Sequence, residues 1–474
     1  METKSWKRAV ARIAAGMGII LWAWTSASAQ APGSKAGQAG RAGITRAAQK
    51  TIDQHIDRQW VKKNMLELNE HWMTASVMPN GFIQENLDRQ WKPWGTQREA
   101  SLNGQGRQLY TLVEGYEYSR DKRYLEAVTK AADFLMKMHD DQYGGYFNRT
   151  TPELKVLDDT KTGFVSFTVF PFANAYRVTK DPKYSKAAMD SFHEVVSKMR
   201  DGQFFKSGLK RDFSGPAPSP YGGREARPGG AAGGAPGSGG PARGAQAGRG
   251  FVPGRHMLNV HMFESFLALY EATKSKEVWD EITAEMAAME KLYDHDLGYL
   301  PEGYDENWKP TTGAMNGGGR MNTGHLFEWA SLFSKAVELG ADPKFIELGS
   351  RSIDLGLKNG YNEAVGGLGG VDAQGKPTQM LWWPQCEVLK ATARYAILHG
   401  RSDLWKYFDK TLAFVKNNYL DTQYGGWFEA VIPGSPKEAR GDRAYIKGAV
   451  DGPEWGSYHQ TTMLTDLLHL SEPH

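Results

Sequence analysis

The stretch DQYGGYFN at residues 141–148 returns late in the chain as TQYGGWFEA at residues 422–430. Four related signals, PNGFIQ, RDGQFFK, HDLGYL and AVGGLGG, are centred on Gly81, Gly202, Gly298 and Gly366. Successive signals lie roughly 60 residues apart, except for one interval of about 96 residues that contains a Gly/Pro/Ala-rich insert. Such a period predicts one repeated architecture rather than several unrelated domains.

The segments between these signals have a helical pattern. Apolar residues recur every three or four positions in YLEAVTKAADFLMKM (124–138) and in EITAEMAAMEKLY (281–293). Two helices and a short extended turn per period, six times, predict an all-α fold. We therefore expect an (α/α)6 barrel with short β-ribbon turns, formed as one catalytic domain by residues 46–474. A barrel of this kind leaves a funnel at one end, which is a natural ligand site.

The N-terminus has the pattern of a secretory signal peptide. Basic residues precede an apolar run and an ASA sequence that ends at Ala29. We expect residues 1–29 to be removed, the protein to be exported to the periplasm or secreted, and residues 30–45 to be flexible. Residues 214–250 offer almost no apolar side chains to bury and are expected to be a disordered insert within the barrel domain.

Composition limits the partners. Without residues 1–29 the chain has 53 basic and 53 acidic residues, so neither nucleic acid nor an anionic membrane surface is expected as a partner. No stretch of the mature chain predicts a membrane span. The single cysteine, Cys386, excludes an internal disulfide framework and a multi-cysteine metal site. The abundant Trp and Tyr residues are compatible with a carbohydrate ligand, because flat rings stack on sugar faces.

Unusual polar residues stand near the starts of several expected helices. An isolated histidine at such a place is more often a cap or a packing residue, and a His–Glu pair at i, i+3 is often an ordinary surface contact. Paired tryptophans usually belong to a core. These places recur in phase with the repeat, however, so a barrel would gather them at one mouth. They contain Arg107, Asn259, His261, Glu264, His325, Glu328, Trp382, Trp383, Gln385, Glu387, Trp455, Tyr458 and His459.

Four of these motifs together resemble the N-acylglucosamine 2-epimerase family, which includes cellobiose 2-epimerases, mannose isomerases and sulfoquinovose isomerases. The motifs are NVHMFE at 259–264, GHLFEW at 324–329, WWPQCE at 382–387 and the terminal YH at 458–459. Their order and approximate spacing agree with the family over most of residues 50–470. The family fold is an (α/α)6 barrel, which agrees with the repeat.

The resemblance implies a role for each matched residue. Arg107 would hold the sugar near its reacting end, and His261 would help to open the sugar ring. His325 and His459 would be the acid/base pair, and Glu328 would orient the ring of His325. The residues expected to bind substrate are Asn259, Glu264, Trp382, Trp383, Gln385, Trp455 and Tyr110. We interpret His256 as a loop residue outside the site.

Histidine suits proton transfer at C2 of an open-chain sugar. Its ordinary pKa near 6.5 lets one ring accept a proton while another donates one near neutral pH. Such a reaction needs no metal and no nucleotide, so we expect no cofactor and a mono- or disaccharide as substrate. Two alternatives remain: a secreted glycan hydrolase or lyase on the same barrel, which usually needs two carboxylates, and a non-catalytic sugar-binding protein.

Overall fold

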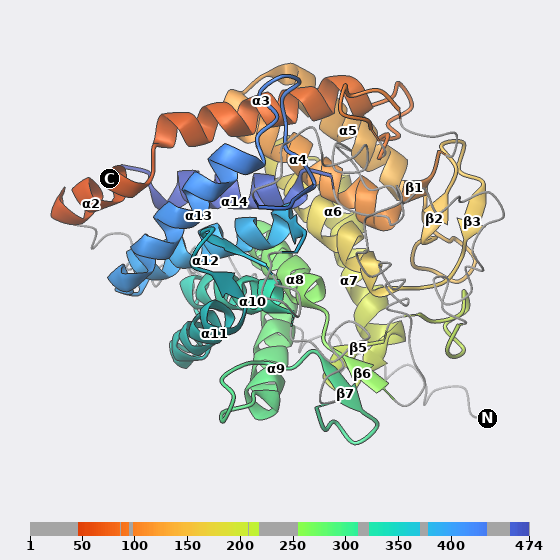
Figure 1. The fold of residues 1–474 in the computed structure, drawn as a ribbon. Helices are drawn as coiled ribbons and strands as arrows, with labels where there is room; N and C mark the ends of the chain where they lie inside the picture. Colours follow the sequence, from red (N-terminus) through yellow and green to blue (C-terminus); the bar gives the residue numbers. More distant parts are fainter. Residues whose placement is uncertain are drawn as a thin grey trace, which may run out of the picture.

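The computed structural model describes residues 46–85, 87–93, 98–206, 208–217, 255–310, 322–369, 378–433 and 456–473. These ranges contain thirteen α-helices, two short 3-10 helices and eleven short strands (Figure 1). The helices are α2 (Arg46–His55), α3 (Arg58–Ser76), α4 (Leu102–Ser119), α5 (Lys122–Met136), η2 (Gly163–Val165), α6 (Ser166–Thr179), α7 (Pro182–Lys198), α8 (Val260–Thr273), α9 (Lys276–Leu292), α10 (Thr323–Glu338), α11 (Lys344–Gly360), α12 (Trp382–Leu398), η4 (Ser402–Leu404), α13 (Trp405–Asn418) and α14 (Tyr458–Leu470). The strands are β1 (Ala100–Ser101), β2 (Arg149–Thr150), β3 (Val156–Asp158), β4 (Arg200–Asp201), β5 (Phe204–Phe205), β6 (Arg255–Met257), β7 (Gly303–Asp305), β8 (Tyr361–Asn362), β9 (Gly367–Leu368), β10 (Met380–Leu381) and β11 (Ala430–Val431).

Six helices form an inner ring. In order around the ring, α4, α6, α8, α10, α12 and α14 each pack against the next, and α14 packs against α4. Where the ring closes, the hydroxyl oxygens of Thr111 and Ser457 lie 3.1 Å apart. Helices α3, α5, α7, α9, α11 and α13 lie outside this ring (Figure 1). The expected (α/α)6 barrel is therefore confirmed.

The burial pattern of each helix explains its place. Helix α4 is buried without a break from Leu102 to Gly115, as a helix surrounded by other helices must be. Helix α5 buries only one stripe, which includes Tyr124, Val128 and Leu135. A one-sided stripe at three- and four-residue spacing belongs to a helix with one face toward solvent.

The glycine signals are the turns that end the outer helices. The glycines at the centre of all six signals have positive φ values between 59° and 91°. Side chains with a Cβ rarely adopt this left-handed backbone, which is why the signal keeps a glycine at each period. At Gly81 an added Cβ would also lie 2.0 Å from the carbonyl oxygen of Lys130.

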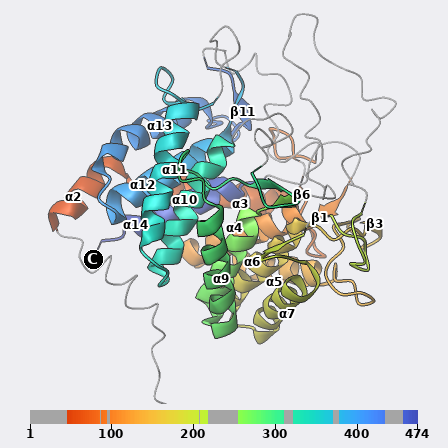
Figure 2. The same ribbon diagram turned by 90° about the horizontal axis from the view of Figure 1, so that it is seen from below.

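Short antiparallel ribbons lie at the N-terminal ends of inner helices. Strands β1 and β10 run directly into α4 and α12, and β6 ends two residues before α8; these strands pair with β2, β11 and β7. Strand β3 extends the first ribbon, and β4 pairs with β5 and β8 with β9. Figure 2 shows β1, β3, β6 and β11 on the side of the barrel away from α2 and the C-terminus. The N-terminal ends of the inner helices thus face the ribbons.

The C-terminal halves of the inner helices carry a ring of alternating charges. Arg177 pairs with Glu114, Lys335 with Glu271 at 2.8 Å, and Arg394 with both Glu338 and Asp466. Each inner helix contributes at least one of these residues. Three cations face four carboxylates, so pairing offsets part of the desolvation cost of the partly buried charges at this end of the barrel. We call these seven residues the charged ring: Glu114, Arg177, Glu271, Lys335, Glu338, Arg394 and Asp466.

Several predictions from the sequence concern segments that the structure does not describe, or describes only in part. The signal peptide (1–29), the flexible segment (30–45) and most of the insert (214–250) lie outside the described residues. Of the insert, only residues 214–217 are described, and there Pro216 forms a bridge with Leu209. Within the described ranges, no helix combines the length and apolarity needed to cross a membrane.

Candidate active site at the N-terminal ends of the inner helices

Every inner helix places an aromatic or charged side chain near its N-terminus. Helix N-termini carry a partial positive charge and backbone N–H groups, which suits a site that develops negative charge. The sequence motifs predicted such residues for five of these helices, α4, α8, α10, α12 and α14, but not for α6. The residues are Arg107 of α4, Phe167 of α6, His261 and Glu264 of α8, His325 and Glu328 of α10, Trp383 and Glu387 of α12, and Tyr458 and His459 of α14.

The ring of His325 is held by a residue from outside the barrel helices. Its Nδ1 lies 2.7 Å from Oε1 of Glu302, which directly precedes β7, and Glu302 also accepts a hydrogen bond from Nε1 of Trp329 at 3.2 Å. The expectation that Glu328 orients this ring is wrong, because Glu328 lies 4.0 Å from Nε2, on the other side of the imidazole. Glu302 therefore fixes the proton of His325 on Nδ1 and makes Nε2 the accepting nitrogen.

His459 has a similar arrangement at Nδ1. This nitrogen lies 2.9 Å from Oε1 of Glu387, and the other oxygen of Glu387 lies 2.7 Å from Nζ of Lys390. His459 and Glu387 are almost fully buried, with side-chain exposures of 2% and 0%. A buried carboxylate at Nδ1 again makes Nε2 the accepting nitrogen.

Trp383 lies against both of these histidines. Its ring centroid is 5.4 Å from that of His325 and 5.5 Å from that of His459. Gly324 allows this approach, because a Cβ there would lie 2.4 Å from the indole. Trp382 and Trp383 both belong to the apolar core that α12 shares with α13 and α14, and the backbone N–H of Trp382 donates to the carbonyl of Glu429. What distinguishes Trp383 is its contact with the two histidines.

His261 forms a second group with Arg107, and both of its nitrogens are engaged. Nη2 of Arg107 lies 2.9 Å from Nε2, and Nδ1 lies 3.2 Å from Glu264, which also accepts from the hydroxyl of Tyr458. The guanidinium of Arg107 lies over the rings of Phe167 and Tyr458, at 4.7 and 4.8 Å. Because arginine only donates, Nε2 of His261 must be the acceptor in this pair.

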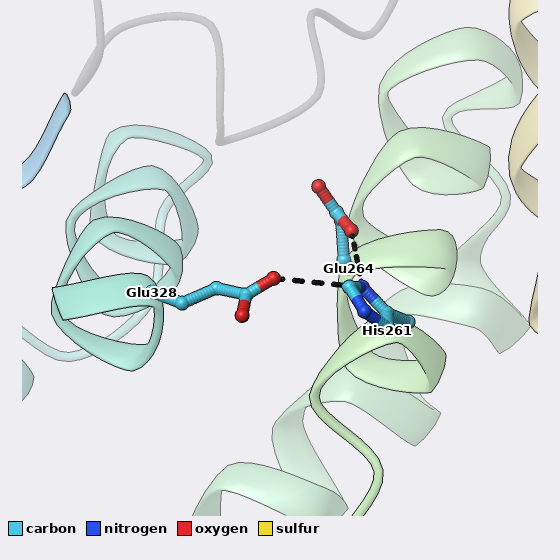
Figure 3. A group of neighbouring side chains, drawn as sticks. All are labelled: His261, Glu264 and Glu328. Carbon is cyan, nitrogen blue, oxygen red and sulfur yellow. Dashed lines mark hydrogen bonds and ion pairs between the residues drawn. The ribbon is translucent and has the colours of Figure 1, made fainter. Parts of the chain in front are cut away.

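Glu328 reaches across from α10 toward His261 of α8 (Figure 3). Its Oε1 lies 3.5 Å from Nδ1 of His261, whereas Oε2 is buried and has no hydrogen-bond partner among the described residues. Burial raises the pKa of Glu328 well above its usual range, and the negative charge of Glu387 adds to this effect. A carboxyl kept neutral in this way can donate a hydrogen bond to a ligand oxygen.

Burial and neighbouring charges shift the pKa values of the site residues. Burial lowers the pKa of His459 to about 4 and that of His261 to about 3, so both rings are neutral near pH 7. Burial by itself raises the pKa of Glu387, but Lys390 and the N–H of His459 outweigh it and lower the pKa to about 2. His459 is therefore a neutral base held by an ionised carboxylate, which is a suitable resting state for proton abstraction.

Two residues that were expected to bind substrate bind backbone groups in the structure instead. Gln385 was expected to contact substrate, but it is fully buried and its amide binds the backbone of Leu368 and Leu381, holding β9 against α12. Asn259 is the N-cap of α8 and bonds three backbone groups. Both side chains support the site instead of lining it.

Three further expectations can be placed. Tyr110 is buried in an aromatic cluster with Phe170 and Tyr458. Trp455 lies outside the described residues. His256 lies in strand β6 and not in a loop, and it pairs with Asp201 at 2.8 Å.

Sequence reasoning missed Glu302 and Lys390. Glu302 stands four residues after Gly298 and on no helix, so helical spacing could not connect it with a histidine. Lys390 did give a signal, because a lysine within the apolar helix CEVLKATARYAIL is unusual unless it is paired. The partner of that lysine is Glu387, one helical turn earlier.

Among the residues that the structure describes, two groups of three side chains bring possible metal ligands within 4.8 Å of one another. One is His261, Glu264 and Glu328, and the other is Glu328, Glu387 and His459. In each group an internal cation already contacts a ligand atom: Arg107 contacts His261, and Lys390 contacts Glu387. A divalent ion would face that cation at short range, so the groups as they stand do not fit a metal.

The sequence profile of the N-acylglucosamine 2-epimerase family matches residues 81–227 and 250–441. The chain belongs to this family. It is therefore an enzyme of the carbohydrate epimerase and isomerase class. A cellobiose 2-epimerase from Eubacterium cellulosolvens is 22% identical over 346 residues, covering 68% of this chain and 78% of that protein. A mannose-6-phosphate isomerase from Rhizobium meliloti is 33% identical over 156 residues, which is 31% of this chain and 40% of its relative's length.

Solved structures with the same fold include a cellobiose 2-epimerase from Spirochaeta thermophila. It matches with a TM-score of 0.71 at 19% identity, covering 90% of this chain and 99% of that one. An α-1,6-mannanase of Salegentibacter gives a lower TM-score of 0.51 at 13% identity, over 87% of this chain and all of its own. The second match shows that a hydrolase can use this barrel, and its likeness is the weaker of the two.

Proposed function

We propose that this family member moves a proton at C2 of a reducing mono- or disaccharide, as a 2-epimerase or an aldose–ketose isomerase. One observation carries the proposal. His325 and His459 lie against the same indole, and each is bound by a buried carboxylate at Nδ1. Paired imidazoles with Nε2 as the accepting nitrogen match a reaction in which one group removes a proton and another supplies one.

The proposed reaction begins with the open-chain sugar. One imidazole takes the C2 proton at Nε2, the C2–H electron pair forms the C1=C2 bond, and the carbonyl electrons move to O1 to give an enediolate. The other imidazole enters protonated on both nitrogens and gives its Nε2 proton to the opposite face of C2, while the O1 electrons re-form the carbonyl, which gives the epimer. A proton to C1 instead, with transfer of the O2 proton to O1, gives the ketose.

In this proposal, two further side chains stabilise the sugar and its enediolate. Arg107 offers positive charge where O1 becomes negative, at the mouth of the barrel where it already contacts His261. Glu328, kept neutral by burial, donates a hydrogen bond to a sugar oxygen through its second carboxyl oxygen. The hydrolase alternative receives less support, because Glu302 and Glu387 are both engaged in holding histidines.

The test follows the C2 proton in heavy water. Glucose, mannose and cellobiose are incubated with the mature protein, and deuterium at C2 and the appearance of epimer or ketose are followed by NMR. The wild type is expected to exchange C2 protons without creating new reducing ends. His325→Asn and His459→Asn are each expected to lose epimer formation by at least about 100-fold while staying folded.

The two variants are expected to differ in exchange. The variant that keeps the abstracting base for a given starting epimer still washes deuterium into unreacted sugar, and the other does not. Near-normal turnover and exchange in both variants would refute the histidine mechanism. New reducing ends from cellobiose would favour the hydrolase, and saturable binding without exchange would favour a non-catalytic sugar-binding protein.

We also propose that the enzyme works outside the cytoplasm, on the basis of the signal-peptide pattern that ends at Ala29. N-terminal sequencing of protein recovered from the periplasm and the medium is expected to begin at Gln30. Recovery only of uncleaved protein from the cytoplasm would contradict this proposal.

A further inference from the structure

Lys390 is a buried cation for which the proposed reaction has no use. It lies on α12 one turn after Glu387, and its side chain is 9% exposed. The chain could place an apolar residue at this position of an inner helix at no electrostatic cost. An ammonium group there carries a desolvation cost that only close pairing offsets.

The groups around Lys390 identify its partner. Glu387 contacts its Nζ at 2.7 Å, whereas Glu264 of α8 acts on it through charge alone. Glu328 of α10 also faces Lys390, as a carboxyl that burial keeps neutral. The remaining titratable or charged groups that interact with this cluster are Cys386 of α12, His459 and Asp466 of α14, and Arg107 of α4. Burial alone lowers the pKa of Lys390, but the carboxylates outweigh burial and raise it, so the cation is permanent.

Glu387 joins this cation to His459. One carboxylate oxygen meets Nζ of Lys390 and the other meets Nδ1 of His459. The carboxylate at the other histidine has a different partner, because Glu302 is bonded by the neutral indole N–H of Trp329. The carboxylate that holds His459 is thus paired with a charge.

We propose that Lys390 is a positioning residue that keeps Glu387 ionised, so that Glu387 holds the proton of His459 on Nδ1 and directs Nε2 toward the sugar. This inference rests on the proposed function for its kinetic consequence, but its structural consequence concerns the tautomer of His459 alone. Without the ammonium, a fully buried Glu387 takes up a proton at higher pH than before and then no longer fixes the ring.

The test uses four variants of the full mature protein: Lys390→Met, Lys390→Arg, Glu387→Gln, and Glu387→Gln combined with Lys390→Met. The tautomer of His459 is followed by ¹⁵N NMR of histidine-labelled protein from pH 5 to 8, with His459→Asn to assign the signal. In the wild type and in Lys390→Arg we expect the Nδ1–H form throughout. In Lys390→Met we expect this form to be lost at the acid end of the range.

The kinetic arm uses mannose and cellobiose. Lys390→Met is expected to lower kcat by about 10- to 100-fold near pH 7, the usual effect of losing a group that orients a reacting residue, with KM changed less than about twofold. The loss of kcat in Lys390→Met is expected to grow as the pH falls, and Lys390→Arg is expected to keep most of the wild-type kcat. Because Lys390 acts through Glu387, the double variant is expected to be no slower than Glu387→Gln.

Three outcomes would overturn the inference. One is an unchanged His459 tautomer in Lys390→Met, and another is a kcat loss equal at every pH. The third is multiplied losses in the double variant, which would make Lys390 an independent substrate contact. If Lys390→Met does not fold, the comparison of the double variant with Glu387→Gln still decides, since neither variant leaves Glu387 as a buried unpaired carboxylate. The tautomer readout separates this inference from the proposed function, whose failure would leave the NMR result intact.

Discussion

Replacing Glu302 by glutamine should separate charge from hydrogen bonding at His325. Glu302 contacts Nδ1 through both oxygens, at 2.7 and 2.8 Å, and it is 9% exposed. When His325 accepts a proton from the sugar, the carboxylate stabilises the new positive charge. At a separation of about 4 Å and an effective dielectric constant near 20, this attraction is on the order of 4 kcal/mol.

The neutral amide of Glu302→Gln still accepts the Nδ1–H bond and retains about 1 kcal/mol of this stabilisation. The remaining loss of about 3 kcal/mol corresponds to a fall in kcat of about 100-fold. The assay is steady-state epimerisation or isomerisation with the best sugar among glucose, mannose and cellobiose, together with thermal unfolding. Glu306→Gln, an exposed carboxylate four residues later, is the matched control and should keep full activity. A kcat for Glu302→Gln within about threefold of the wild type would refute the electrostatic role of Glu302.

Three other predictions follow from burial. Trp382→Ala should cost about 3–5 kcal/mol in urea unfolding, whereas Trp383→Ala should mainly weaken sugar binding, and equal stability losses would contradict this split. Glu285 on α9 is buried, its Oε1 has no partner among the described residues, and burial raises its pKa well above 4.5. The folded state therefore keeps a proton that the unfolded chain releases, so stability from this group is present below pH 4.5 and is lost as the pH rises, by up to about 1.4 kcal/mol per pH unit. Glu285→Met should thus stabilise more at pH 8 than at pH 5, and a pH-independent gain would count against this reasoning. Deleting residues 218–250 should change Tm by on the order of 2 °C or less, and a larger loss of cooperative unfolding would show that the insert packs.

The barrel could be predicted because its signals are local. A glycine at each turn after an outer helix is required by the backbone at that one residue, as at Gly81 and Gly425. The difference between inner and outer helices is likewise present in the spacing of apolar residues. Neither signal depends on knowing which distant segments meet.

The partners of the site could not be predicted in this way. Helical spacing pointed to Glu328 as the partner of His325, but that side chain lies 4.0 Å from Nε2, and the Nδ1 contact comes from Glu302, 23 residues earlier and on another element. Asn259 and Gln385 were assigned to the substrate by motif. Each instead satisfies backbone groups, a need that appears only once the helix ends and ribbons are in place.

The contact that closes the barrel also has a kinetic consequence. Thr111 and Ser457 meet across 346 positions of the chain, so closing this loop costs more entropy than a contact between successive helices, and we expect the pairing to form after the intervening helices have ordered. His459 lies on α14, which begins directly after Ser457, and Asp466 further along α14 completes the charged ring. Nascent chains and fragments that lack α14 therefore have neither the second imidazole nor a sealed barrel. We expect activity to appear during refolding as one late event, after most of the helical signal has returned.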